Sequence, residues 1–220
     1  MVRFENVTIK YGESLIIKDV SFQIREKEKV VIYGKSGSGK TTILTTILGA
    51  HIPSAGTVYF DGKAVSSKNI LNVRRAVSFI GQEPVLGAEK IRDAILLPYS
   101  FKINRGRIPP EEHIFEFLEK LYLDRDILDK DVSVVSGGEK QRVAIVRELL
   151  QDKKVFLVDE LTSALDKESK KAVLNLFRNS SYTLISVSHD SDWYQICRRF
   201  MKIDRGRVVN ISHKPDPGFI

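Results

Sequence analysis

The chain has little cysteine and no long apolar run, and both features narrow the classes of protein it can belong to. Cys197 is the single cysteine among 220 residues, which excludes an intrachain disulfide and fits a reducing cytosol. No stretch approaches the roughly 18 consecutive apolar residues of a membrane-spanning helix, so we expect no span within the chain. Met1–Glu5 leads straight into strand-like sequence, so we also expect no signal peptide.

The charge is modest and well mixed. Lysine and arginine total 35 against 28 acidic residues, a formal net charge of +7. The basic residues are dispersed apart from Arg74–Arg75, Arg198–Arg199 and the stretch 102–107. Such a surface is solvated by both signs, so we expect no nucleic-acid partner and at most a weak preference for an anionic membrane face. The 42% hydrophobic content is that of a globular protein.

A phosphate-binding loop is the first motif present. Residues 34–41 fit the pattern G-x-x-x-x-G-K-[ST], between a β-branched run at 29–33 and a helical pattern at 43–48. Its glycines let backbone N–H groups turn toward one point, and the helix N-terminus adds positive charge there. Lys40 is expected to reach the β- and γ-phosphates, and Thr41 to hold Mg²⁺. The residues assigned to the nucleotide here are Gly34, Lys35, Ser36, Gly37, Ser38, Gly39, Lys40, Thr41 and Thr42.

An acidic strand follows far downstream. Residues 155–158 are apolar in succession, which is typical of a strand covered on both faces, and they run into Asp159 and Glu160. Ligands of parallel sheets bind beyond the carboxyl ends of the strands, which predicts that both carboxylates lie beside the phosphate loop. We expect Asp159 to orient the Mg²⁺ shell and Glu160 to act as general base toward water. The alternative is an ordinary solvated strand end.

A second anion-binding turn lies between these two motifs. Ser136, Gly137, Gly138 and Glu139 open a helix whose apolar residues recur at helical spacing. A serine N-cap followed by two glycines leaves backbone N–H groups available to an anion. The alternative is an ordinary capped helix, because Glu139 also suits a capping box, and the two interpretations are compatible.

In this order, the three motifs resemble the nucleotide-binding domain of ABC ATPases over nearly all of residues 1–212. The resemblance implies an α/β fold: a P-loop NTPase core with a parallel sheet, an antiparallel β edge subdomain and a helical lobe. It implies ATP and Mg²⁺ as ligands and a homodimer, or a paired ATPase subunit, that forms on ATP binding. Each ATP would then lie between one chain's Lys40 and the other chain's Ser136 and Gly138.

Four further positions take their expected roles from this resemblance. Tyr11 resembles the aromatic residue that stacks on adenine, and Gln82 the glutamine that links the Mg²⁺ site to a membrane partner. Asp166, in Ser163–Asp166, belongs to the loop that touches the opposite subunit, and His189 resembles the histidine that contacts the γ-phosphate. The expected catalytic residues are Glu160, His189 and Gln82, and the expected metal ligands are Thr41, Gln82 and Asp159.

Two residues depart from the family pattern. Glu139 stands where glutamine is usual, and Leu161 where proline is common. Neither change removes a catalytic group, although Leu161 affects how the following loop is set, so the coupling between chains is less firmly predicted than ATP binding.

The chain is expected to form a single ABC-type ATPase domain over residues 1–220. Alternating patterns predict an antiparallel edge sheet from residues 1–33 and 56–66. The α/β core comes from 34–55, 76–83 and 153–212, and the helical lobe from about 84–150. In that lobe Ile114, Phe117, Leu118 and Leu121 form an apolar stripe that predicts core packing. The tail, 213–220, is expected to fray.

The leading functional hypothesis is an ATP switch that powers a separate integral membrane permease from the cytoplasmic face of the cell membrane. The segment 91–99, the turn 136–142 and Leu161 together resemble a small branch of stand-alone ATPases linked to metal export, with iron as the suggested cargo. A generic importer or a lipid-handling ATPase stays open. Two competing hypotheses are an ATPase that regulates a non-transport membrane partner and a soluble machine that acts on nucleic acid.

Overall fold

The structure is a computed structural model, and it describes residues 1–214. These residues divide into two compact units: residues 1–79, 154–160 and 181 onward form the first, and residues 80–153 and 161–180 form the second. The expectation of a single domain stays a prediction, and the predicted fraying of residues 215–220 lies outside the described residues.

The first unit contains an antiparallel sheet of four strands in the order β2-β1-β4-β5. Its strands are β1 (Val2–Tyr11), β2 (Ser14–Ile24), β4 (Ala55–Phe60) and β5 (Lys63–Ala64). In β1 the residues Val2, Phe4, Val7 and Ile9 are buried, as expected of a strand with one face on a core. This is the predicted antiparallel edge sheet, except for the run at 29–33.

The run Lys29–Tyr33 belongs to the other sheet of this unit, not to the antiparallel edge. As β3 it pairs in parallel with β8 (Thr183–Val187) and β9 (Arg199–Asp204). Val30 to Tyr33 are buried without alternation, which is the signature of a strand covered on both faces. The six-stranded order is β10-β9-β3-β8-β7-β6, completed by β7 (Val155–Asp159), β6 (Val77–Ile80) and β10 (Arg207–Ser212).

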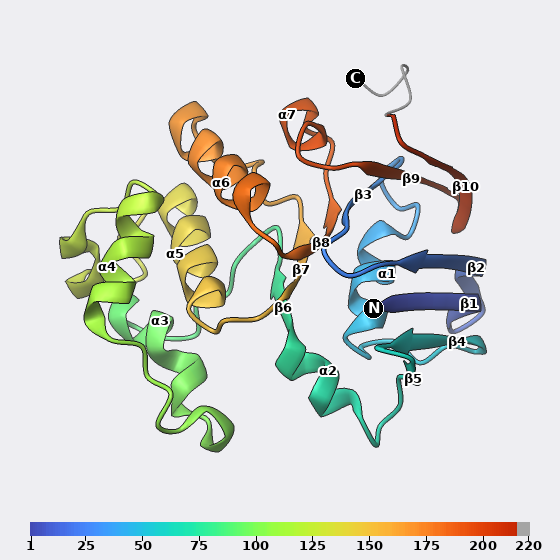
Figure 1. The fold of residues 1–220 in the computed structure, drawn as a ribbon, viewed down its shortest axis with the longest axis horizontal. Coiled ribbons are helices and arrows are strands. Elements are labelled where there is room, and N and C mark those ends of the chain that lie inside the picture. The colour runs from blue at the N-terminus through green and yellow to red at the C-terminus, as the bar shows by residue number, and fades with distance from the viewer. Residues whose placement is uncertain (215–220) are drawn as a thin grey trace. The chain divides into compact units, whose positions relative to one another are not determined.

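Helix α1 (Lys40–Ile47) packs between these two sheets (Figure 1). It contacts β2 and β4 of the antiparallel sheet and β7 and β8 of the six-stranded sheet. Its buried side chains Ile43, Leu44 and Ile47 enter the main hydrophobic core of the unit. The helix begins three residues before the pattern at 43 suggests, because Lys40 already follows the last loop glycine. Two shorter helices, α2 (Ile70–Ala76) and α7 (Ser191–Tyr194), complete this unit.

The second unit is helical. It holds α3 (Ile91–Ser100), η1 (Lys102–Asn104), α4 (Glu111–Lys120), η2 (Arg125–Asp129), α5 (Gly137–Leu149) and α6 (Lys167–Asn179). Helix α5 contacts both α3 and α4 (Figure 1). Ile114, Leu118 and Leu121 are buried and Phe117 is half-buried, so the apolar stripe is core packing as predicted. The sequence pattern places α6 with the α/β core, whereas the structure places it in this unit.

Candidate active site

The phosphate loop of the first unit requires glycine at two positions. Gly34 has φ +148°, and a Cβ there would lie 2.0 Å from the carbonyl oxygen of Ile203. Gly39, the residue before α1, has φ +100°, and a Cβ there would meet the Ile17 side chain at 2.6 Å. Neither position admits a larger residue without displacing these neighbours, so glycine lets the loop pack closely against them. Helix α1 begins directly after the loop, and a helix N-terminus favours an anion.

Lys40 lies inside this loop with its side chain almost fully buried. It is 8% exposed, and its ammonium donates to the carbonyl oxygens of Gly34, at 2.9 Å, and Lys35, at 3.0 Å. Burial lowers the pKa of Lys40, and the charges of Glu160 and Asp159 oppose that shift. A cation is thereby positioned at the first turn of α1 and held by carbonyl groups that a phosphate can replace.

Ser38 supplies an independent sign that the loop fits a ligand. It is buried, and its hydroxyl has no hydrogen-bond partner within residues 1–214. Buried hydroxyls are normally satisfied, so one without a partner in an anion-binding loop fits a group that a phosphate oxygen completes.

Asp159 lies beside the phosphate loop, at the place that the strand-end rule predicts, and its role at Mg²⁺ stays a prediction. Thr41 donates its hydroxyl to Asp159 Oδ2 at 2.7 Å, although the two residues are separated by 118 positions. Burial raises the pKa of Asp159, and the hydrogen bond from Thr41 partly offsets that shift. A threonine hydroxyl and a carboxylate oxygen are ligands that Mg²⁺ prefers, so the pair fits a magnesium ion bound beside the loop.

Glu160 and His189 come from the ends of neighbouring strands and face each other. Glu160 follows β7 with φ +48°, and its N–H donates to Val187, the last residue of β8, at 2.9 Å. Its Oε1 lies 3.7 Å from Nε2 of His189, and both side chains are partly exposed. Besides burial, which is the larger cause, the charge of Glu160 acts upward on the pKa values of both Lys40 and Asp159, so its carboxylate lies near the groups that fit a phosphate and Mg²⁺, as a general base requires.

Tyr11, the last residue of β1, is 71% exposed, as a stacking platform requires. Its ring meets that of His51 edge-on, with centroids 6.1 Å apart, and His51 Nε2 lies 3.0 Å from the Thr45 hydroxyl. Sequence analysis missed His51, because nothing local to residue 51 indicates that β1 ends beside it.

A cavity of about 520 Å³ also borders the loop. Its walls are residues 34–38, Lys202, Ile203 and Asp204 of β9, Arg205 of the following turn, and Val209 of β10. Lys40, Thr41 and Asp159 do not line it, so it is separate from the pair that fits magnesium.

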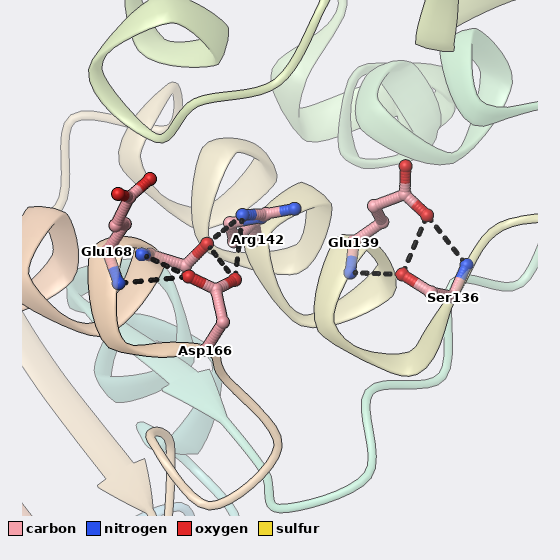
Figure 2. Close-up of polar contacts among 6 residues, drawn as sticks. Ser136, Glu139, Arg142, Asp166 and Glu168 are labelled. Carbon is pink, nitrogen blue, oxygen red and sulfur yellow. Dashed lines mark hydrogen bonds and ion pairs between the residues drawn. The ribbon is translucent and has the colours of Figure 1, made fainter.

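In the second unit, the predicted turn at 136–139 is a complete capping box (Figure 2). Ser136 is the N-cap of α5: its hydroxyl oxygen accepts from the Glu139 N–H, and the Glu139 carboxylate accepts from the Ser136 N–H. Gly137 has open space around it, whereas a Cβ at Gly138 would lie 3.1 Å from the Ala164 carbonyl oxygen. Both proposed uses of this turn, helix cap and anion site, are compatible with that geometry.

Asp166 is the N-cap of α6 in the same unit. Its Oδ1 accepts from the N–H groups of Glu168 and Ser169 at 2.9 Å, and its Oδ2 accepts from the Ser169 hydroxyl at 2.6 Å. Arg142 of α5 reaches both Ser169 and Asp166, the latter at 3.6 Å (Figure 2). The contact of Asp166 with a second subunit stays a prediction. Leu161, the departure from proline, is buried at the start of this segment.

Gln82 follows β6 and is exposed, and its predicted roles at the metal and in catalysis stay predictions. The structure adds what holds this segment. The buried Gln141 of α5 donates to the Gly81 carbonyl oxygen at 3.2 Å, and Arg147 of α5 donates to those of Val85 and Leu86. Sequence analysis missed both, because they join residues about 60 positions apart.

The fold and these sites define a P-loop ATPase with a second, separate anion-binding turn. The comparisons with known proteins agree. The sequence profile described as ABC transporter matches residues 17–163. The probable iron export ATP-binding protein FetA of Escherichia coli is 34% identical over 196 residues, 87% of this chain and 86% of that protein. The chain belongs to the ABC transporter family, and within that family it is an ATP-hydrolysing subunit.

Two further comparisons extend this result. The energy-coupling factor transporter ATP-binding protein EcfA1 of Mycoplasmoides gallisepticum is 35% identical, over 100% of this chain and 80% of that protein. The dimeric post-hydrolysis structure of the ATP-binding cassette MJ0796, bound to ADP and Pi, matches with a TM-score of 0.87 and 30% identity, over 98% of this chain and 100% of that one. That cassette is therefore a dimer that holds the products of ATP hydrolysis. Within residues 1–214, no helix is long and apolar enough to cross a membrane.

Proposed function

We propose that two copies of this chain close around ATP and thereby power a separate integral membrane permease. The proposed cargo is a metal ion, and iron is the first candidate. The observation that carries the proposal is the division of candidate phosphate-binding groups between two motifs, a loop with a buried lysine and a serine-capped turn with two glycines at the start of α5. The chain would act on the cytoplasmic face of the membrane. The similarity to FetA supports iron as cargo.

The energy that this switch requires is within reach of the groups present. Moving a dimer from 1:99 to 99:1 closed takes about 5.5 kcal/mol, or roughly 3 kcal/mol for each of two nucleotides. Hydrogen bonds to charged groups contribute about 1.5–3 kcal/mol each. Two such bonds, from the Ser136 hydroxyl and the Gly138 N–H to a γ-phosphate held by another chain, would contribute about 3–6 kcal/mol before the cost of displacing any internal partner.

Hydrolysis would reverse the closure. Mg²⁺ held by Thr41 and Asp159, with Gln82 as a further predicted ligand, would neutralise charge on the β- and γ-phosphates. Glu160 accepts the proton of the attacking water, and His189 lies close enough to hold that carboxylate or contact the γ-phosphate. Loss of the γ-phosphate removes the group that joins the two chains, and the dimer opens.

The contact with a permease is assigned to the segment after Gln82. Val85 is 82% exposed, and the carbonyl oxygens of Val85 and Leu86 are held by Arg147 of α5. The carbonyl of Gly81 is held by Gln141 of the same helix, whose first residues form the anion-binding turn. A partner that moves this segment therefore acts on the helix that presents Ser136.

The test is an affinity pull-down from solubilised native membranes with Glu160→Gln as bait in the presence of ATP. We expect one multi-span membrane protein in stoichiometric amount. The matched control is the Lys40→Ala, Glu160→Gln double variant, which lacks the phosphate-binding cation and should recover much less of it. Recovery of only soluble protein or nucleic acid would overturn the transport proposal in favour of a soluble machine.

The cargo is tested in lipid vesicles that hold the recovered membrane protein together with the parental chain, which retains Glu160. Stimulation of ATP hydrolysis and ion movement by Fe²⁺, compared with Mn²⁺ and Zn²⁺, supports metal export. A complex with no ion-dependent activity argues instead for another cargo or for a regulatory role at the membrane.

A further inference from the structure

The carboxylate of Glu139 already occupies the turn that is expected to receive a phosphate (Figure 2). Its Oε2 accepts from the Ser136 N–H at 2.8 Å and from the Ser136 hydroxyl at 2.7 Å. The hydroxyl oxygen in turn accepts from the Glu139 N–H at 3.2 Å. The proton that Ser136 would donate to a γ-phosphate is therefore committed to a carboxylate of the same chain.

This carboxylate is charged at neutral pH. The hydrogen bonds from Ser136 hold the pKa of Glu139 below its ordinary value, with a smaller contribution from the charges of Lys130 and Arg142. An anion at the first turn of a helix is favourable for the helix by itself. It is unfavourable for a second anion at the same turn, because like charges a few ångströms apart repel.

The N-cap of α6, in the same unit, is a carboxylate whose charge is balanced by a nearby arginine. Asp166 also places a carboxylate at a helix N-terminus, but Arg142 lies 3.6 Å from it. Among the described residues Glu139 has no ion-pair partner: Lys130 pairs with Asp126 at 3.2 Å, and Arg142 with Asp166. Within residues 1–214, the charge at the α5 turn is thus uncompensated by any direct ion pair.

On the proposed function, the two requirements on Ser136 cannot be met together. We infer that Glu139 is an internal competitor of the γ-phosphate: its carboxylate leaves Ser136 when the second chain's ATP arrives, and this exchange weakens the ATP-driven dimer. Glutamine, the usual residue of the family at this position, can keep the bond from the Ser136 N–H through its neutral carbonyl oxygen. Glu139 therefore raises the ATP concentration at which the dimer closes, and it favours reopening of the dimer.

The experiment measures the ATP concentration at half-maximal dimerisation by size-exclusion chromatography with light scattering, in the Glu160→Gln background. Adding Glu139→Gln is expected to lower that concentration by about tenfold. The matched control is Glu168→Gln, which removes the same charge from the first turn of α6, where Glu168 contributes only its backbone N–H to the cap. It is expected to stay within about twofold of the parent.

A second variant, Glu139→Ala, removes the charge and the acceptor of the Ser136 N–H and hydroxyl, but it keeps the backbone N–H that Ser136 caps. Tighter dimers for both the glutamine and the alanine variants assign the effect to the charge, as inferred. Unchanged or weaker dimers for both overturn the inference and leave Glu139 as a helix cap. A gain confined to the glutamine variant also overturns it, because the amide itself then supplies the contact.

Failure of the proposed function gives a different result. If the parent binds ATP but neither it nor any variant dimerises, the two-chain switch is wrong, whatever the role of Glu139. Thermal unfolding by circular dichroism confirms that each variant is folded before its dimerisation is compared.

Discussion

The two units bring their anion-binding groups into position in different ways. In the first unit the groups come from distant parts of the chain, as in the bond of Thr41 to Asp159, and both Lys40 and Asp159 are buried. In the second unit the turn is local and exposed, and its serine is bonded to a carboxylate three residues away. The first unit holds the Lys40 ammonium in its loop, whereas the second unit holds the Glu139 carboxylate in its turn.

The difference indicates how binding and switching are separated. A site with a buried lysine and an unsatisfied hydroxyl binds a phosphate by itself. A turn that already satisfies itself gains only from a ligand strong enough to displace the internal group. We therefore expect nucleotide affinity to depend on the first unit, and closure of the dimer to depend on the second.

The largest effect is expected from Glu160→Gln, which tests the chemistry assigned to the first unit. Loss of a general base lowers the hydrolysis rate about a hundredfold or more, because amide nitrogen and oxygen cannot take the water's proton. ATP binding should persist, measured with a fluorescent nucleotide analogue. Glu26→Gln, at an exposed position of the same unit, is the charge-matched control. Hydrolysis by Glu160→Gln at the parental rate would remove Glu160 from the mechanism.

Ser136→Ala tests the role of the second unit in dimerisation. Without the hydroxyl, the turn loses a donor to the γ-phosphate, and we expect about tenfold more ATP to be needed for dimerisation. ATP binding by the single chain should change much less, since it depends on the first unit. Thr41→Ala provides the contrast, because it should weaken Mg²⁺-dependent binding by the single chain. Equal loss of single-chain binding in both variants would contradict the division of roles.

The contacts of the two units also differ in how far the sequence predicts them. The turn at 136–139 is predictable because its contacts span three residues. The bond between Thr41 and Asp159 is predictable only through the rule that ligands lie beyond the carboxyl ends of parallel strands. The bonds of Gln141 and Arg147 to residues 81–86 carry no local pattern at all.

The corrected elements have a similar cause. The run 29–33 is strand-like from its composition, but its sheet is decided by its partners β8 and β9. Helix α6 has the same amphipathic pattern in either unit, so only packing assigns it to the second.

A smaller effect is expected from Tyr99→Phe in the second unit. The Tyr99 hydroxyl donates to the Leu150 carbonyl at 2.7 Å, and burial raises the pKa of Tyr99 to about 12. Its loss leaves the carbonyl at the end of α5 without that donor and should cost about 1 kcal/mol. For a chain of this length the melting temperature should fall by roughly 2–4 °C. An unchanged melting temperature would indicate that water replaces the hydroxyl.

The smallest effect concerns Cys197 in the first unit. Burial raises the pKa of its thiol from 9.0 to about 12, so the folded protein holds the neutral thiol at pH 8. We expect almost no reaction with a disulfide reagent until the protein is unfolded. Because the folded pKa is raised, the stability linked to this group is present below pH 9 and is lost as the pH rises toward 12. Rapid labelling of the folded protein would show that the core around Cys197 opens.

The central claim is that ATP joins the phosphate loop of one chain to the α5 turn of another. The most direct test mixes Ser36→Cys chains with Gly137→Cys chains, both carrying Glu160→Gln, and treats them with a short thiol cross-linker. The native thiol is buried, and Gly137 has room for a side chain. The account predicts a cross-linked dimer only when both variants and ATP are present. No cross-link with ATP bound, or the same yield without nucleotide, would contradict it.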